Sequence, residues 1–276
     1  MNRHVIARSA TKVGDEAISL EIATIPVWTL YLRAASEFLI RPLLPRVIID
    51  KNQALQKVHD AGKKGEGLVI IFTHFSLRDA VETNLSIVYK DPVLRNREVI
   101  NPLAYHQYNK ILELIGKIYH GTFVPIVNNS TINKKGYGHL PKGKGLQEFI
   151  THSSNTLAKG GVVSLAVNAT RSEKLDIDDP QKPIGYLIAS LQAKGIKSYG
   201  LLLVSFAVKN AGNYTKKEVG GMNFGKTYIM NLANYYSVEE LLNNSEISGK
   251  VGNIDKFVRL EIARLSPKEY LNQAVS

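Results

Sequence analysis

Short apolar segments alternate with segments of helical periodicity along most of this 276-residue chain. The apolar segments are rich in Val, Ile, Leu and Phe and have the length of buried strands. Strands that alternate with helices form a mostly parallel sheet flanked by helices, so we predict an α/β fold. The predicted strands are 68–73, 98–101, 122–127, 162–167, 199–208 and 226–230, and the predicted helices are 77–89, 106–115, 146–159, 184–194 and 254–265. We expect Gly116 to end the second helix and the last strand to extend an edge of the sheet.

The N-terminal part differs in composition, so we divide the chain into a helical, membrane-associating segment, 1–60, and an α/β domain, 61–276. The longest uncharged run in this part, Ile22–Leu32, is shorter than the ~20 residues of a spanning helix. Trp28 and Tyr31 lie beside arginines on apolar sequence, as in helices at a bilayer interface. A helical layer packed on the core is the alternative. We predict peripheral attachment to the cytoplasmic face of a membrane.

The net charge of +11 favours anionic partners. Acidic lipid headgroups, coenzyme A, acyl carrier protein and nucleic acid all qualify. The lysines are dispersed and no aromatic stacking motif is interleaved with them, so nucleic acid is not expected. The chain has no cysteine, which excludes disulfides, thiolate metal sites and a cysteine nucleophile. No histidine pair has the spacing of a zinc site, and we expect no metal.

A histidine and an aspartate follow the first predicted strand, separated by four residues. His74 comes where the strand ends, and Asp79 falls in the first turn of the next helix. Across a strand-to-helix turn the two side chains can approach, giving a histidine base oriented by a carboxylate. Ser76 followed by Asp79 is also the spacing of a helix capping box. The two interpretations are compatible, because Ser76 can cap the helix while Asp79 turns toward His74.

His74-x-Ser76-x-x-Asp79 after an apolar strand resembles the first block of the glycerolipid acyltransferases. This family comprises the glycerol-3-phosphate and lysophospholipid acyltransferases, whose signature is a histidine, four residues and an aspartate. The resemblance implies acyl transfer from a thioester, acyl-CoA or acyl carrier protein, to an alcohol, with a role in phospholipid biosynthesis. It implies His74 as general base, a glycerol-3-phosphate acyltransferase-like fold, and no cofactor beyond the thioester co-substrate. Thr73 stands where the family most often has asparagine.

Three further blocks match in part over roughly residues 60 to 210. Gly121 opens a strand similar to the second block, but Val127 stands where that block has arginine. Residues 166–172 keep the Thr-Arg-Ser of the third block without its glutamate, and 200–208 lacks the proline of the fourth. The resemblance implies that the acceptor is held by a set of mostly polar residues. These are Ser76, Arg78, Gly121, Thr170, Arg171 and Ser172.

Two parts of the sequence are candidates to supply the cations that the family uses to bind a phosphate-bearing acceptor. Arg171 is retained, and a guanidinium suits a phosphate, although a surface ion pair with Glu173 or Asp176 is the alternative. The insert 133–145 has four lysines among glycines and is a candidate to bind an anion in place of the missing arginine. A solvated surface loop is the alternative.

The sequence therefore predicts an O-acyltransferase that acts on a glycerolipid or lysophospholipid-like acceptor at an anionic membrane surface. The acceptor hydroxyl would lie against His74 Nε2, and Asp79 would fix the tautomer from the other ring nitrogen. One rival is a non-catalytic relative that binds a lipid or acyl carrier protein. The other is a basic nucleic-acid binder.

Overall fold

The computed structural model describes residues 47–49, 53–74, 77–168, 174–179, 182–210, 213–214, 226–244 and 251–272. Within these ranges the side chains of residues 47, 48, 77, 78, 251 and 252 stay outside the description. Nothing is described of residues 1–46, where most of the predicted membrane-associating segment falls.

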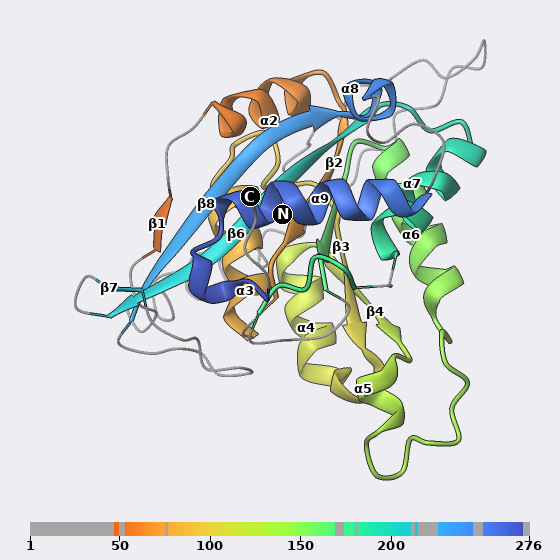
Figure 1. The fold of residues 1–276 in the computed structure, drawn as a ribbon. Helices are drawn as coiled ribbons and strands as arrows, with labels where there is room; N and C mark the ends of the chain where they lie inside the picture. Colours follow the sequence, from red (N-terminus) through yellow and green to blue (C-terminus); the bar gives the residue numbers. More distant parts are fainter. Residues whose placement is uncertain are drawn as a thin grey trace, which may run out of the picture.

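Eight strands in the described residues form one mixed sheet, in the order β1-β8-β6-β2-β5-β3-β4, with β7 paired to β6 (Figure 1). Five consecutive strands in this order, from β6 to β4, run parallel. β8 runs antiparallel to β6, and β1 runs parallel to β8. The prediction of a mostly parallel sheet flanked by helices is confirmed at this level. The strands are β1 (Val47–Ile49), β2 (Gly67–Phe72), β3 (Val99–Ala104), β4 (Gly121–Ile126), β5 (Val162–Ala166), β6 (Tyr199–Asn210), β7 (Asn213–Tyr214) and β8 (Thr227–Ser237).

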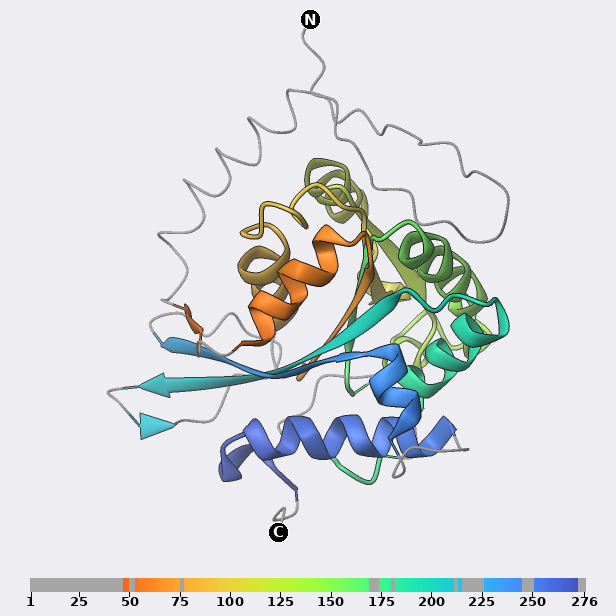
Figure 2. The same cartoon turned by 90° about the horizontal axis from the view of Figure 1, so that it is seen from above.

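Helices cover both faces of the sheet, so the central strand β2 is buried along its whole length. Successive β2 side chains point to opposite faces. Ile70 packs with the face covered by α2 and η2, and Ile71 with the face covered by α6, α7, α8 and α9. Figure 2 shows α2 and α9 on opposite sides of β6 and β8. The helices are α2 (Ala54–Lys63), α3 (Leu77–Thr83), η2 (Asn84–Val88), η3 (Tyr105–Gln107), α4 (Lys110–Tyr119), α5 (Asn129–Ile132), α6 (Leu146–Ala158), α7 (Pro183–Ala193), α8 (Val238–Asn243), α9 (Val251–Leu265) and η4 (Lys268–Tyr270).

The predicted boundary after residue 60 falls inside α2. Ala54, Val58 and Ala61 are buried on that helix and belong to the core cluster on their face of the sheet. The strand β1 also lies within the predicted helical segment and pairs with β8. The described end of this segment is therefore part of the α/β domain. None of the helices in the described part of the chain has the length and apolar character to cross a bilayer.

Two local expectations are corrected. Gly116 lies inside α4, which continues to Tyr119 and ends at His120 in a left-handed conformation with φ of 52°. A Cβ on Gly116 would lie 2.5 Å from the Gly121 carbonyl oxygen, so this glycine permits close packing of α4 on β4. The last predicted strand becomes β8, which lies between β1 and β6 and is not an edge. Tyr228 on β8 is fully buried, as is typical of a residue on an inner strand.

The connections from β2 and β5 leave on opposite faces of the sheet. From β2 the chain passes through α3 and η2 to β3, and from β5 it passes through α7 to β6. Ile87 of η2 and Ile188 of α7 belong to the core clusters of opposite faces. Because β2 and β5 are neighbours, the carboxyl ends of these strands mark a topological switch point, where open α/β sheets bind ligands. We call this end of the parallel strands the carboxyl edge, and the opposite end the amino edge.

Candidate functional site

The residues that follow β2 are fixed by hydrogen bonds to both neighbouring strands. The Thr73 backbone N–H donates to the Val204 carbonyl of β6 at 3.1 Å. The Thr73 hydroxyl oxygen accepts from the Phe206 backbone N–H at 2.9 Å. On the other side, the Val167 backbone N–H donates to the Phe72 carbonyl at 2.8 Å. These contacts give Thr73 a structural role and fix the backbone from which His74 projects.

His74 lies at the carboxyl edge, directly beyond the end of β2. Its ring meets the ring of Phe72 edge-on, with centroids 5.8 Å apart and planes at 83°. The residue is half-buried, and its Nδ1 atom is enclosed. An imidazole held against a buried aromatic ring has a restricted orientation, as a general base needs.

Asp79 lies in the first turn of α3 and is fully buried. A carboxylate in the first turn of a helix is favoured by the helix dipole. The Thr83 hydroxyl donates to the Asp79 backbone carbonyl at 2.8 Å, one turn further along the helix. A buried carboxylate therefore lies in the first turn of the helix that follows His74. Phe75 and Ser76 between them lie outside the described residues, as does the side chain of Arg78.

The exit of β5 lies beside the exit of β2. Val167 and Asn168 are both buried and follow the last residue of β5, the strand beside β2. Thr170, Arg171 and Ser172 follow them and lie outside the described residues. The two segments that the sequence singled out, one after β2 and one after β5, therefore leave adjacent strands at the switch point.

Tyr270 is a residue at this edge that the sequence did not indicate. Its side chain is buried, its hydroxyl accepts from the Val208 backbone N–H at 3.2 Å, and it donates to the Val208 carbonyl at 3.3 Å. Burial raises the pKa of Tyr270 to about 12, against the effect of the Val208 hydrogen bond, and the negative charge of Asp79 contributes to the rise. The separation of nearly 200 residues explains why no local pattern connects Tyr270 with Asp79.

The C-terminal segment, residues 270–272, also contacts Leu175, which follows the third block in the chain. The Leu175 backbone N–H donates to the Tyr270 carbonyl at 2.8 Å, and the Asn272 N–H donates to the Leu175 carbonyl at 3.2 Å. Leu175 and Leu271 form a parallel bridge. The segment around Tyr270 is therefore anchored both to β6 and to the chain beyond Ser172.

The structure places Gly121 far from His74. Gly121 opens β4 and is paired with Val99, which in turn is level with Leu68 near the start of β2. His74 is six residues further along that strand direction, a separation of roughly 20 Å. A ligand held at the carboxyl edge would have to extend along the whole sheet to meet Gly121.

The basic insert returns to the carboxyl edge and pairs with the end of β4. The Val127 N–H donates to the Lys144 carbonyl at 2.9 Å, and the Gly143 N–H donates to the Val127 carbonyl at 2.8 Å. Gly145 has a φ of 87°, and a Cβ there would lie 2.1 Å from the Pro125 carbonyl oxygen, so the close approach requires glycine. The end of the insert is therefore a fixed part of the edge.

Lys144 of the insert lies beside an aromatic residue at the carboxyl edge. Its ammonium nitrogen lies 5.5 Å from the centre of the Tyr105 ring, which follows β3. Tyr137 of the insert lies edge-on to Tyr105, with centroids 6.4 Å apart. Val127 itself is buried and carries no charge. Lys144 thus places a cation near the end of β4, where the chain has Val127.

The N-terminus of α7, on the same edge, is already occupied by a carboxylate of the chain. Asp255 of α9 is buried and accepts from the backbone N–H groups of Ile184 at 3.1 Å and Gly185 at 2.8 Å. Burial raises the pKa of Asp255, and these two hydrogen bonds oppose the rise. This helix end therefore serves an internal contact and offers no site for a substrate phosphate.

The described residues contain no group of three or more histidine or acidic side chains arranged to hold a metal ion. A scan against protein-family models and a search of curated proteins found no match to this chain.

Proposed function

We propose that this protein is an O-acyltransferase, similar to the glycerolipid acyltransferases. It transfers a fatty acyl group from acyl-CoA or acyl carrier protein to a hydroxyl of a glycerolipid or lysophospholipid-like acceptor, at the cytoplasmic face of a membrane. The observation that carries the proposal is the position of His74. His74 follows the central strand β2 at the switch point, and the buried Asp79 lies in the first turn of the next helix.

In the proposed reaction His74 acts as general base. Because Nδ1 is enclosed, the acceptor hydroxyl is assigned to Nε2, which removes its proton as the oxygen attacks the thioester carbonyl. The tetrahedral intermediate collapses, the carbon–sulfur bond breaks, and the thiolate takes the proton back from His74. Asp79 orients the ring and stabilises the imidazolium that forms between these steps.

The acceptor's anionic head is assigned to cations on both sides of this centre. Arg171, supported by Thr170 and Ser172, follows the strand on one side of the switch point. Lys144 supplies the second cation, since it is fixed beside Tyr105 where the second-block arginine is absent. A lysine binds phosphate as a point charge, with less geometric selectivity than an arginine.

The test is thioester consumption by the purified protein with acyl-CoA and a panel of lysophospholipids. Wild-type protein should transfer the acyl group, and His74→Ala should lower kcat by about 10²–10⁴-fold with an unchanged circular dichroism spectrum. Lys144→Ala should raise KM for an anionic acceptor while kcat is kept, and Lys135→Ala, an exposed lysine of the same insert, is the control. Near-normal turnover by His74→Ala would refute the base assignment. Binding of acyl-CoA by wild-type protein without any transfer would favour a non-catalytic relative.

A further inference from the structure

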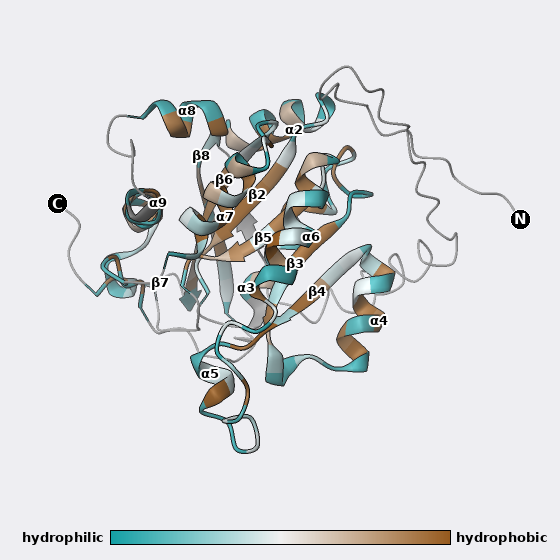
Figure 3. Cartoon of the chain, turned by 90° about the vertical axis from the view of Figure 1, so that its right-hand side faces the viewer, coloured by the Kyte–Doolittle hydropathy of each residue, from teal (hydrophilic) through white to brown (hydrophobic). Residues whose placement is uncertain are grey.

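Helix α4 presents large apolar side chains to solvent along one side. Ile111 is 70% exposed, Leu114 52% and Ile115 38%, and Tyr108, just before the helix, is 41% exposed. Residues three and four apart lie on the same side of a helix, so these side chains form one stripe. Figure 3 shows α4 at the periphery of the molecule, with brown and teal alternating along its ribbon.

The residues Gly116 and Tyr119, in the second half of α4, contact the rest of the fold. Gly116 is buried against the start of β4. The ring of Tyr119 packs on Tyr89 with centroids 5.1 Å apart, and the Tyr89 hydroxyl donates to the Tyr119 carbonyl at 2.8 Å. The helix is also capped, since the Asn109 side chain accepts from two backbone N–H groups of its first turn. With these contacts made, Ile111, Leu114 and Ile115 still leave much of their surface exposed.

Lysines lie beside the stripe on α4 and in the insert that follows β4 in the sequence. Lys110 and Lys117 lie on α4, and Lys117 pairs with Glu113 at 2.9 Å. Residues 110–147 contain six lysines and one acidic residue, Glu113. The other four lysines of this stretch lie in the insert that follows α4 and β4, and all four are exposed. An apolar stripe bordered by lysines is the arrangement of a helix that lies in an anionic bilayer interface.

We propose that α4 is a membrane-binding surface, with Ile111, Leu114 and Ile115 seated in the interface of an anionic bilayer and the neighbouring lysines among its headgroups. The helix starts at the carboxyl edge, where the Tyr108 backbone N–H donates to the Tyr105 carbonyl at 3.2 Å. Contact through α4 thus brings Tyr105 and Lys144 close to the lipid surface. This last step, delivery of a lipid acceptor to His74, rests on the proposed function, whereas membrane binding by α4 does not.

The absence of cysteine permits a direct experiment, because a single introduced cysteine can be labelled selectively. Leu114→Cys would carry an environment-sensitive fluorophore on α4. The matched control is Tyr186→Cys on α7, where the native side chain is 59% exposed. The label at Leu114 should shift to the blue with vesicles of phosphatidylcholine and phosphatidylglycerol, and much less with phosphatidylcholine alone, while the label at Tyr186 should not respond.

Several results would overturn the proposal. They are a Leu114 label that does not respond when the protein is vesicle-bound, equal responses of the two labels, and no vesicle binding at all. A blue shift that depends on protein concentration without vesicles would assign the stripe to a second copy of the chain.

Cosedimentation with the same vesicles provides the second measurement. Ile111→Ser combined with Leu114→Ser should weaken binding by about tenfold or more, whereas Tyr186→Ser should bind as wild type. Transfer to a water-soluble acceptor should be unchanged in the double variant, so loss of membrane binding is distinguishable from loss of catalysis. Unchanged vesicle binding by a folded double variant would also overturn the proposal.

Discussion

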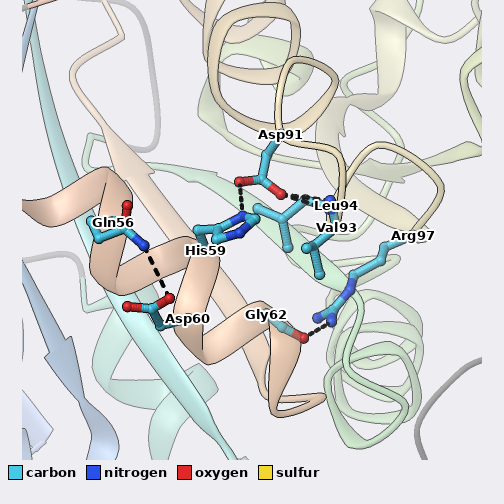
Figure 4. A network of polar contacts seen from close by, with 8 residues as sticks. All are labelled: Gln56, His59, Asp60, Gly62, Asp91, Val93, Leu94 and Arg97. Atoms are coloured by element: carbon cyan, nitrogen blue, oxygen red, sulfur yellow. Dashed lines mark hydrogen bonds and ion pairs between the residues drawn. The ribbon is translucent and has the colours of Figure 1, made fainter.

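The amino edge and the carboxyl edge of the sheet each hold a histidine and an aspartate, in different surroundings. At the amino edge, His59 of α2 contacts Asp91 at 2.9 Å, with side chains 22% and 16% exposed (Figure 4). The other oxygen of Asp91 accepts from the backbone N–H groups of Val93 at 2.7 Å and Leu94 at 3.0 Å. This aspartate thus fixes the turn after η2, and its contact with His59 joins that turn to α2.

Arg97 completes the amino edge. Its guanidinium donates to the carbonyls of Gly62, Glu66 and Gly160, which precede β2 or β5 (Figure 4 shows the Gly62 contact). The Arg97 guanidinium therefore connects the segments that precede β2 and β5 with the segment that precedes β3. At the carboxyl edge, by contrast, His74 projects beyond the sheet at a switch point. The contact between His59 and Asp91 shows that a histidine bound to a carboxylate is not by itself a sign of catalysis. The role that we propose for His74 depends instead on its position at the switch point.

The largest effect is expected when His74 and His59 are each replaced by glutamine in separate variants. His74→Gln should lower kcat for acyl transfer by about 10²–10⁴-fold and change the free energy of unfolding by less than about 1 kcal/mol. His59→Gln should cost about 1 kcal/mol of stability, through the lost contact with Asp91, and leave kcat unchanged. Urea unfolding and thioester assays of both variants check this. If His59→Gln alone abolished turnover, the roles of the two edges would be reversed.

Arg97→Met should destabilise the protein by about 3 kcal/mol, because three backbone carbonyls lose a charged donor. Lys63→Met is the control, since Lys63 is exposed at the same edge next to Gly62, and its effect should stay within about 0.5 kcal/mol. Urea unfolding gives both values. A loss below about 1 kcal/mol for Arg97→Met would show that the amino edge does not depend on this cation.

The smallest effects concern two neighbouring glycines of the amino edge. Gly116→Ala should cost about 1–2 kcal/mol, because the added methyl group meets a backbone oxygen that cannot move aside easily. Gly121→Ala should cost less than about 0.5 kcal/mol, since its Cβ would lie 3.4 Å from the nearest atom, the Val99 carbonyl oxygen. KM for the acceptor should be unchanged in Gly121→Ala. A clear rise in KM would instead support the substrate-binding role that the second-block resemblance implies.

The sequence predicted the strand-to-helix connection around His74 because its signals are local. The apolar run before Thr73 and the helical spacing after it both lie within one window of the chain. It did not predict β1 or the inner position of β8, because a three-residue strand has no periodicity and strand order depends on pairing between distant segments. The sequence also predicts a helix end at Gly116, because the close contact of this glycine with Gly121 exists only in the folded protein.

The sequence by itself determined the positions of the central strands β2, β4, β5 and β6 and of the helices α6, α7 and α9, and that a histidine and an aspartate follow the same strand. Hydrophobic periodicity encodes these properties residue by residue. The tertiary structure alone decided that β2 and β5 are neighbours, that the insert sets Lys144 beside Tyr105, and that the Tyr270 hydroxyl bonds to the backbone of Val208. These depend on hydrogen bonds and packing between residues far apart in the chain, which no local pattern records.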